Sequence, residues 1–162
     1  MTDFIIDTNV AVVANMQNEH VVSSCIDACI SLIASIPGNH RIVIDESDQV
    51  RTEYAGALAM GKPFQLGAQF LVHVLRHQFD SKHVLRLALD QLEDGSFADF
   101  PTSPGLATFD PSDRKFVALA VRSGVPVTNA VDSDWADSAQ DLEAAGVVVN
   151  FLCGSDKSSW LK

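Results

Sequence analysis

Short apolar runs alternate along this chain with longer segments whose apolar residues recur at helical spacing. Each short run is bounded by polar or turn-forming residues, which is the pattern of a buried β-strand. We predict strands over residues 3–6, 41–45, 125–129 and 147–152. Residues 84–89 alternate only loosely, so this segment is compatible with either a strand or a helix.

The longer segments predict helices, and some of them carry helix-end signals. Asp110, Pro111 and Gly124 stand at the N-cap, the first helical position and the C-cap of one such segment. Pro63 falls in the first turn of another, where proline is tolerated. A polar turn is expected directly after the first strand, and residues 96–105 are expected to form a loop. The predicted helices cover residues 19–36 (ending at Pro-Gly-Asn), 46–61, 62–78, 111–124 and 133–146.

Strands therefore alternate with helices, which is the order of an α/β fold. Parallel strands need crossover connections, and helices usually supply them, so the sheet is expected to be mainly parallel with helices on both faces. The chain has 162 residues and is most simply one domain, residues 1–162.

Composition supports a globular protein, because 47% of the residues are hydrophobic. No apolar run approaches the ~18 residues that a membrane span needs. Asp3 stands where a signal peptide would carry positive charge. The chain is therefore expected to be cytoplasmic and to have no membrane partner.

The three cysteines, Cys25, Cys29 and Cys153, agree with that expectation. Their number is odd, and they lack the spacing of a four-ligand zinc site. We interpret them as buried free thiols.

Carboxylates follow the predicted strands at their carboxyl ends, where open parallel sheets bind ligands. Asp7 follows the first strand, and Asp132 follows the strand at 125–129 through Asn129. Asp113 lies in the first turn of the helix that feeds this strand, and Glu53 lies in the helix after the second strand. Each acid also has an ordinary interpretation as a helix cap or a solvated side chain, and Asp110 is more typical of a cap.

Several carboxylates this close cannot all stay ionised unless a cation neutralises them. Oxygen ligands without thiolates select Mg²⁺ or Mn²⁺ rather than zinc. Such ions polarise phosphoryl oxygens and activate water, so phosphate chemistry is expected.

Four stretches in order, "FIIDTNV", "RIVIDESDQVRTEYAGAL", "SDRKFVALAV" and "VPVTNAVDSDW", resemble the PIN domain, a family of metal-dependent nucleases. The resemblance covers nearly the whole chain except residues 62–104, a segment expected to be helical and variable in the family. It implies a three-layer α/β/α fold. The site residues that it implies are the acids Asp7, Glu53, Asp113 and Asp132, a fifth acid Asp134, and the polar residues Asn9 and Thr128.

Two assignments stay open at this point. Glu46 stands at the strand end and competes with Glu53. The residues Asn-Ala-Val between Thr128 and Asp132 depart from the commonest family spacing, which leaves Asp132 and Asp134 as alternatives for the late metal ligand.

The activity that the resemblance implies is endonucleolytic hydrolysis, usually of single-stranded RNA, with Mg²⁺ or Mn²⁺. Activated water would attack phosphorus and leave 5′-phosphate and 3′-hydroxyl ends. Many members are toxins of bacterial toxin–antitoxin pairs and others process RNA, so the implied partners are RNA, a protein inhibitor or antitoxin, and a second copy in a homodimer.

The alternative is a degenerate module that binds protein or RNA without catalysis. Two phosphate enzymes fit less well: a dehalogenase-like phosphatase would need Asp in place of Asn9, and a receiver domain would need a late lysine.

The net charge of −10 opposes nucleic-acid binding, but its distribution is uneven. Residues 54–89 carry several basic groups against Asp80 alone, and we hypothesise that the segment 62–86 holds the substrate backbone through Arg76, Lys82 and Arg86. Arg114 and Lys115 are expected on a solvated helix face.

His73 and His77 have the i, i+4 spacing of a metal pair, but no third ligand follows at zinc spacing, so a solvent-facing or RNA-facing helix is favoured.

Overall fold

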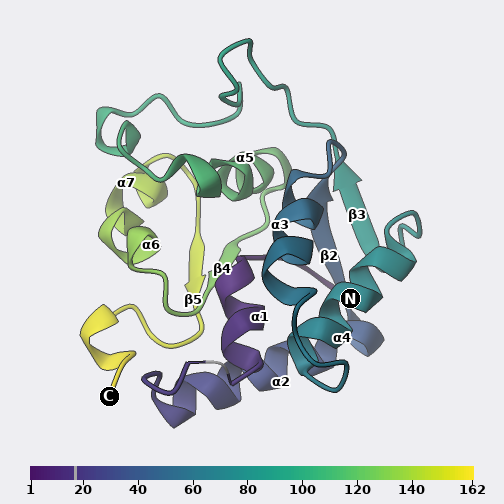
Figure 1. The fold of residues 1–162 in the computed structure, drawn as a ribbon. Helices are drawn as coiled ribbons and strands as arrows, with labels where there is room; N and C mark the ends of the chain where they lie inside the picture. The colour runs from purple at the N-terminus through teal and green to yellow at the C-terminus, as the bar shows by residue number, and fades with distance from the viewer. Residues whose placement is uncertain (17) are drawn as a thin grey trace.

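The computed structural model describes residues 1–16 and 18–162. Its centre is one sheet of five parallel strands in the order β3-β2-β1-β4-β5, so the first strand of the chain lies in the middle (Figure 1). The strands are β1 Thr2–Ile6, β2 His40–Asp45, β3 Val84–Leu87, β4 Val127–Asn129 and β5 Val149–Phe151.

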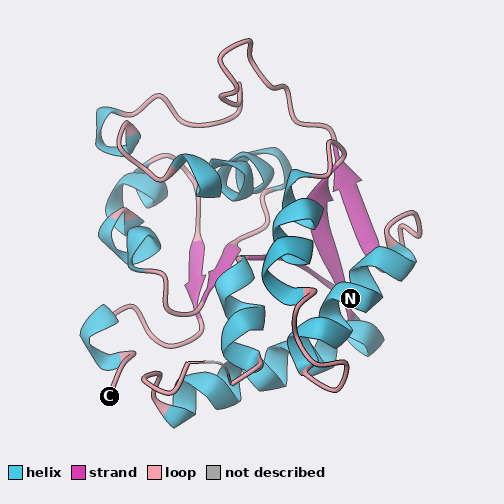
Figure 2. Ribbon diagram, in the orientation of Figure 1, coloured by secondary structure: helices cyan, strands magenta, loops and turns pink. Residues whose placement is uncertain are grey.

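Helices make the connections, as expected for parallel strands. The helices α1 to α4 pack against one another, whereas α5 packs on β1, β2 and β4. Figure 2 shows the long irregular segment between β3 and the start of α5. The α-helices are α1 Thr8–Ala14, α2 Ser23–Asn39, α3 Gln49–Leu58, α4 Leu66–His77, α5 Arg114–Ser123, α6 Ser133–Asp137 and α7 Ala139–Ala144. The 3-10 helices are η1 Pro104–Leu106, η2 Pro111–Asp113 and η3 Lys157–Ser159.

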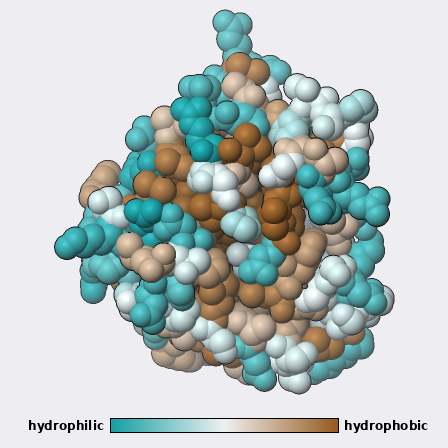
Figure 3. Space-filling model, turned by 180° about the vertical axis from the view of Figure 1, so that it is seen from behind, coloured by the Kyte–Doolittle hydropathy of each residue, from teal (hydrophilic) through white to brown (hydrophobic). Residues whose placement is uncertain are grey.

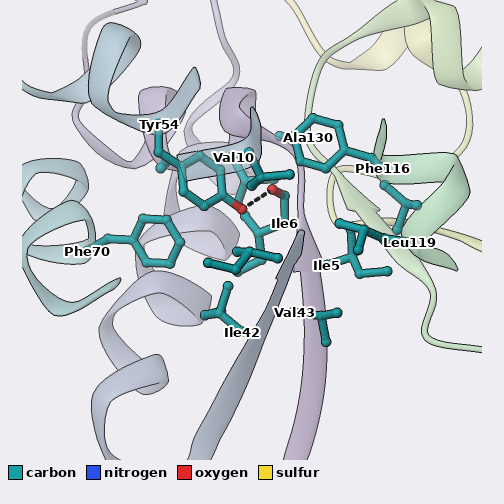
Figure 4. Close-up of a cluster of buried hydrophobic side chains, with 14 of the residues drawn as sticks. Ile5, Ile6, Val10, Ile42, Val43, Tyr54, Phe70, Phe116, Leu119 and Ala130 are labelled. Carbon is teal, nitrogen blue, oxygen red and sulfur yellow. Dashed lines mark hydrogen bonds between the residues drawn. The ribbon is translucent and has the colours of Figure 1, made fainter. Parts of the chain in front are cut away.

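Adjacent residues of β1 point to opposite faces of the sheet, because side chains alternate along a strand. Ile6 lies on the side of Tyr54 and Phe70, which come from α3 and α4, whereas Ile5 lies on the side of Phe116 from α5 (Figure 4). These side chains are all buried. The sheet is therefore covered by helices on both faces, and the predicted three-layer α/β/α architecture is confirmed.

The two faces are not covered equally at the edge strand β3. The register places Leu85 beside Val43, on the α5 face, and Leu85 and Leu87 are only half-buried there. The view from behind in Figure 3 shows hydrophobic residues near the middle of the face, inside a rim of hydrophilic ones.

The first connection is a helix, not the polar turn that the pattern predicted. The Asp7 carboxylate caps α1 by accepting a hydrogen bond from the main-chain N–H of Asn9. The helix has only 7 residues and most are buried, so it lacks the polar face by which an amphipathic helix is found.

Other boundaries differ by a few residues. The helix α2 continues through Pro-Gly-Asn, because the N–H of His40 still bonds to the carbonyl of Ile36. Pro63 lies before α4 rather than in its first turn. Residues 133–146 form two short helices instead of one, and 84–89 contains a strand. The end signals of the segment 111–124 are confirmed: Asp110 accepts from the N–H of Ser112, and Gly124 adopts a φ of 73°.

A disulfide joins Cys25 in α2 to Cys153 after β5, and Cys29 is a buried free thiol. The interpretation of all three cysteines as free was therefore wrong for this pair. The two residues are 128 positions apart and meet only through the fold, which spacing does not reveal. Because disulfides are rare in the reducing cytosol, cysteine usage no longer supports the cytoplasmic expectation.

The C-terminal tail folds back onto the start of α2. Trp160 is buried, and its indole N–H donates to the carbonyl of Gly154. Val21 pairs with Leu161 in an antiparallel bridge. Of the helices in residues 1–16 and 18–162, none is long and apolar enough to cross a membrane.

The disulfide gives a test of the fold. Replacing Cys25 and Cys153 together by alanine should lower the free energy of unfolding by about 2–4 kcal/mol, because the unfolded chain loses a long covalent loop. Urea titration with and without reductant measures this. Wild type and the control Cys29→Ala should lose stability on reduction while the double variant does not respond. A wild-type unfolding curve that is the same with and without reductant would contradict the assignment of a disulfide between Cys25 and Cys153.

Candidate functional site

The carboxyl ends of β1 and β4 meet at the topological switch point of the sheet. From β1 the chain runs to β2 and β3 on one side, whereas β4 and β5 lie on the other side. The main-chain N–H of Asp7 donates to the carbonyl of Thr128 over 3.0 Å and joins the two strand ends. Ligands of open α/β sheets bind in the crevice at such a point.

Three carboxylates converge there. Asp7 caps α1, Asp113 ends η2, and Asp132 caps α6. One carboxylate oxygen of each lies within 4.8 Å of the others. The sequence-based prediction that these acids gather at one edge of the sheet therefore agrees with the geometry.

Asp7 is held from both sides. One carboxylate oxygen accepts from the N–H of Asn9 at 3.0 Å, and the other accepts from the indole N–H of Trp135 at 2.6 Å. The side chain is 4% exposed, and burial raises the pKa of Asp7 to about 6 against the lowering effect of these hydrogen bonds. Sequence reasoning missed Trp135, although its position three residues after Asp132 placed it beside the site.

Asp113 is the most perturbed acid of the group. Burial, followed by the negative charges of Asp7 and Asp132, raises the pKa of Asp113 to about 8. Burial also raises the pKa of Asp132, while a hydrogen bond with Asp113 lowers it. The raised pKa of Asp113 therefore favours its protonated form near neutral pH when no cation is bound.

Glu53 is near this group but is engaged by other side chains. Its carboxylate accepts a hydrogen bond from Thr8 and forms an ion pair with Lys115. The negative charge of Glu53 contributes to the raised pKa values of Asp7 and Asp113, whereas Glu46 is exposed. Between the two alternatives, the structure brings Glu53 rather than Glu46 to the acids.

The interpretation of Arg114 and Lys115 as a solvated helix face was wrong. Lys115 is 6% exposed and also donates to the carbonyl of Ser112 in η2. Arg114 donates to the carbonyls of Ala107 and Phe109 and so holds the loop before η2. Sequence periodicity could not show these contacts, because Glu53 is remote in sequence from Lys115 and the other acceptors are main-chain carbonyls.

Asp132 and Asp134 occupy different places. Asp132 belongs to the inner group, whereas Asp134 is exposed and joins Asp110 and Asp113 in an outer group. A hollow of about 470 Å³ borders this outer group. It is lined by Thr108, Phe109, Asp110, Pro111, Asp134, Asp137 and Ser138.

A pair of asparagines fixes the loop that delivers Asp132. The side-chain amide of Asn9 donates to Asn129 at 2.9 Å, and its oxygen accepts from the N–H groups of Ala130 and Val131. Asn129 in turn bonds to both the N–H and the carbonyl of Asp132. The Asn-Ala-Val residues therefore form a loop that hydrogen bonds from Asn9 hold against α1.

Among the other predicted substrate residues, Thr128 lies beside Asp7 at the end of β4 but is only 1% exposed. The predicted basic residues lie elsewhere. Arg76 and Lys82 flank the turn between α4 and β3, at the amino edge of the sheet, opposite the acids; this turn is at the right of Figure 1. Arg86 forms an ion pair with Asp48 at 3.0 Å and donates to a main-chain carbonyl. The structure does not bring these basic groups to the carboxylates.

The inner group fits a hard divalent cation. Its donors are carboxylate oxygens, which Mg²⁺ and Mn²⁺ prefer. The oxygens are close together, and Asp7 and Asp113 are buried. A cation would offset the burial and the repulsion by neighbouring carboxylates that together raise the pKa of Asp113. Asp7, Asp113 and Asp132 are the residues that would hold it.

The raised pKa of Asp113 makes stability depend on pH. Between its ordinary value near 4 and the folded value of about 8, the folded protein binds more protons than the unfolded chain. The free energy of unfolding should therefore fall as pH rises through this window in EDTA. Urea titrations at pH 5 and pH 8 measure it. Asp113→Asn should flatten the dependence, and the exposed control Asp27→Asn should keep it; equal slopes in both variants would contradict the assignment.

The arrangement of the acids is the basis for inferring a function. Comparison of the chain with models of protein families, with curated proteins and with solved structures finds no match.

Proposed function

We propose that this protein is a PIN-like, Mg²⁺- or Mn²⁺-dependent endoribonuclease that hydrolyses phosphodiester bonds of single-stranded RNA. The observation that carries the proposal is the convergence of Asp7, Asp113 and Asp132 at the switch point of a parallel sheet. The four stretches that resemble the PIN domain supply these residues in the same order along the chain. The hollow beside Asp110 and Asp134 leaves open space next to them.

The residues of the chain have distinct roles in this proposal. When bound, the cation supplies charge neutralisation at the phosphoryl oxygens and activation of water. Asp7, Asp113 and Asp132 bind it, and Trp135 and the Asn9–Asn129 pair keep two of these carboxylates in place. Hydrolysis would form a bond from water oxygen to phosphorus and break the bond from phosphorus to O3′, which leaves a 5′-phosphate and a 3′-hydroxyl.

The ion pair between Glu53 and Lys115 favours a second candidate, a PIN-like module that binds RNA or protein without catalysis. A carboxylate already paired with a buried lysine is less available to a cation. The two candidates differ in whether RNA is cleaved. Lys115→Met should lower cleavage if the ion pair only positions Glu53, whereas a module would show no cleavage in any variant.

Cleavage of a mixed single-stranded RNA pool tests the proposed function. With Mg²⁺ or Mn²⁺, the wild type should produce 5′-phosphate ends, and Asp7→Asn and Asp132→Asn should each lose about 100-fold or more in rate, because removal of a preorganised charged group costs several kcal/mol in the transition state. Asp27→Asn is the matched control, and circular dichroism checks folding. Equal rates for wild type and Asp7→Asn would sink the site assignment.

Cation binding should also depend on pH. Asp113 must release its proton when the cation binds, so affinity for Mg²⁺ should rise by about tenfold per pH unit between pH 6 and 8. Isothermal titration in buffers of different ionisation enthalpy measures the released proton. Absence of any Mg²⁺ or Mn²⁺ binding at pH 8 would refute the enzyme proposal, and affinity that does not change with pH would refute the role of Asp113.

A further inference from the structure

A group of histidines lies at the turn between α4 and β3, away from the acidic site. His73 and His77 are one helical turn apart on α4, and His83 stands just before β3. The ring centroids of His77 and His83 are 4.4 Å apart, and His73 lies 4.8 Å from His77 and 5.4 Å from His83. The sequence offered only the helical pair, because the third imidazole arrives through the turn.

The turn also brings a carboxylate to this group. The N–H of Asp80 donates to the carbonyl of His77 at 2.8 Å, and the N–H of His83 donates to the carbonyl of Asp80 at 2.9 Å. Side-chain donor atoms of His77, Asp80 and His83 all lie within 4.8 Å of one another. The main-chain bonds therefore fix the spacing of three potential ligands.

The Asp80 carboxylate accepts one hydrogen bond, from the main-chain N–H of Lys82 at 3.0 Å, but an imidazole nitrogen of the group has no partner in the part of the chain that the structure describes. Nε2 of His73 is buried and has no hydrogen-bond partner among the described residues. Nε2 of His83 lies 3.9 Å from a carboxylate oxygen of Asp80, too far for a hydrogen bond between the two side chains. His83 and Asp80 are 32% and 46% exposed in their side chains, so solvent and ions can reach them.

We propose that His77, Asp80 and His83 form a second metal site, specific for Zn²⁺ or a similar borderline ion. Two imidazole nitrogens and one carboxylate oxygen are a donor set that zinc prefers and Mg²⁺ does not. Nitrogen and oxygen ligands lie about 2.0–2.2 Å from a zinc ion. Small rotations of these partly exposed side chains would bring their donor atoms to that distance from one ion. His73 packs against both rings and limits their rotation. The remaining position is open to solvent.

The two sites would differ in chemistry and in place. The acidic group offers oxygen donors at the carboxyl edge of the sheet, and the histidine group offers mainly nitrogen donors at the amino edge. A bound ion here would connect the end of α4 to the start of β3 and stabilise the edge of the sheet. This inference does not depend on the proposed nuclease function.

Titration of the full chain with Zn²⁺ in excess Mg²⁺ tests the proposal, because the excess Mg²⁺ would compete for carboxylate oxygens but not for imidazole nitrogens. Competition with a chromogenic chelator should show one ion bound with micromolar or tighter affinity. His77→Gln and His83→Gln should each weaken binding by about 100-fold or more, since loss of a ligand exceeds the 10–100-fold cost of losing a second-shell partner. His20→Gln, an exposed histidine outside the group, should bind as the wild type does.

Further variants distinguish Zn²⁺ binding at the histidines from Zn²⁺ binding at the acidic group or at a cysteine. Asp113→Asn and Cys29→Ala should keep the affinity, and the Co²⁺-substituted protein should show no sulfur-to-metal charge-transfer band. Zn²⁺ should raise the melting temperature of the wild type but not of His77→Gln, whose apo melting curve reports its folding. The proposal is overturned if Zn²⁺ binds only in the millimolar range, if both histidine variants bind it as tightly as His20→Gln, or if Asp113→Asn or Cys29→Ala abolishes binding.

Discussion

The hydrogen bond from the N–H of Asp7 to the carbonyl of Thr128 marks the constraint on which the site depends. It forms only because β1 lies between β2 and β4, so that strands far apart in sequence end side by side. Helices begin close to both strand ends, at Thr8 and at Ser133. Each helix start needs a cap, and in both cases the cap is an aspartate of the inner group.

Capping and cation binding are therefore not competing explanations of these aspartates. Asp7 and Asp132 each use one oxygen to accept a main-chain N–H, which fixes the carboxylate in space. These hydrogen bonds prevent the carboxylates from moving apart, and burial increases the electrostatic repulsion between their negative charges. The folded protein thus holds three acids in an arrangement that is unfavourable without a compensating positive charge, and our proposal of a cation site rests on this.

The sequence predicted the parts that depend on local pattern. Four of the strands, the α/β class and the cap signals around Asp110, Pro111 and Gly124 follow from hydrophobic periodicity and from end residues. Asp7 and Asp132 follow from their place after strands, and Asp113 from its place at a helix start. It missed α1, because a short buried helix has no polar face. It also missed the disulfide, the Lys115–Glu53 ion pair and the Trp135 contact, because each joins residues that only the folded topology brings together. The basic segment was placed at the substrate from charge alone, and charge carries no information about which edge of the sheet it occupies.

The central position of β1 has a consequence for the order in which the chain acquires structure. The strand β1 is made before the other strands of the sheet, yet one of its edges has no partner until β4 has emerged from the ribosome. The disulfide from α2 to Cys153 and the pairing of Val21 with Leu161 need residues that are made later still. One edge of β1 must therefore stay unpaired until β4 has been made, and the three acids of the inner group can come together only after that.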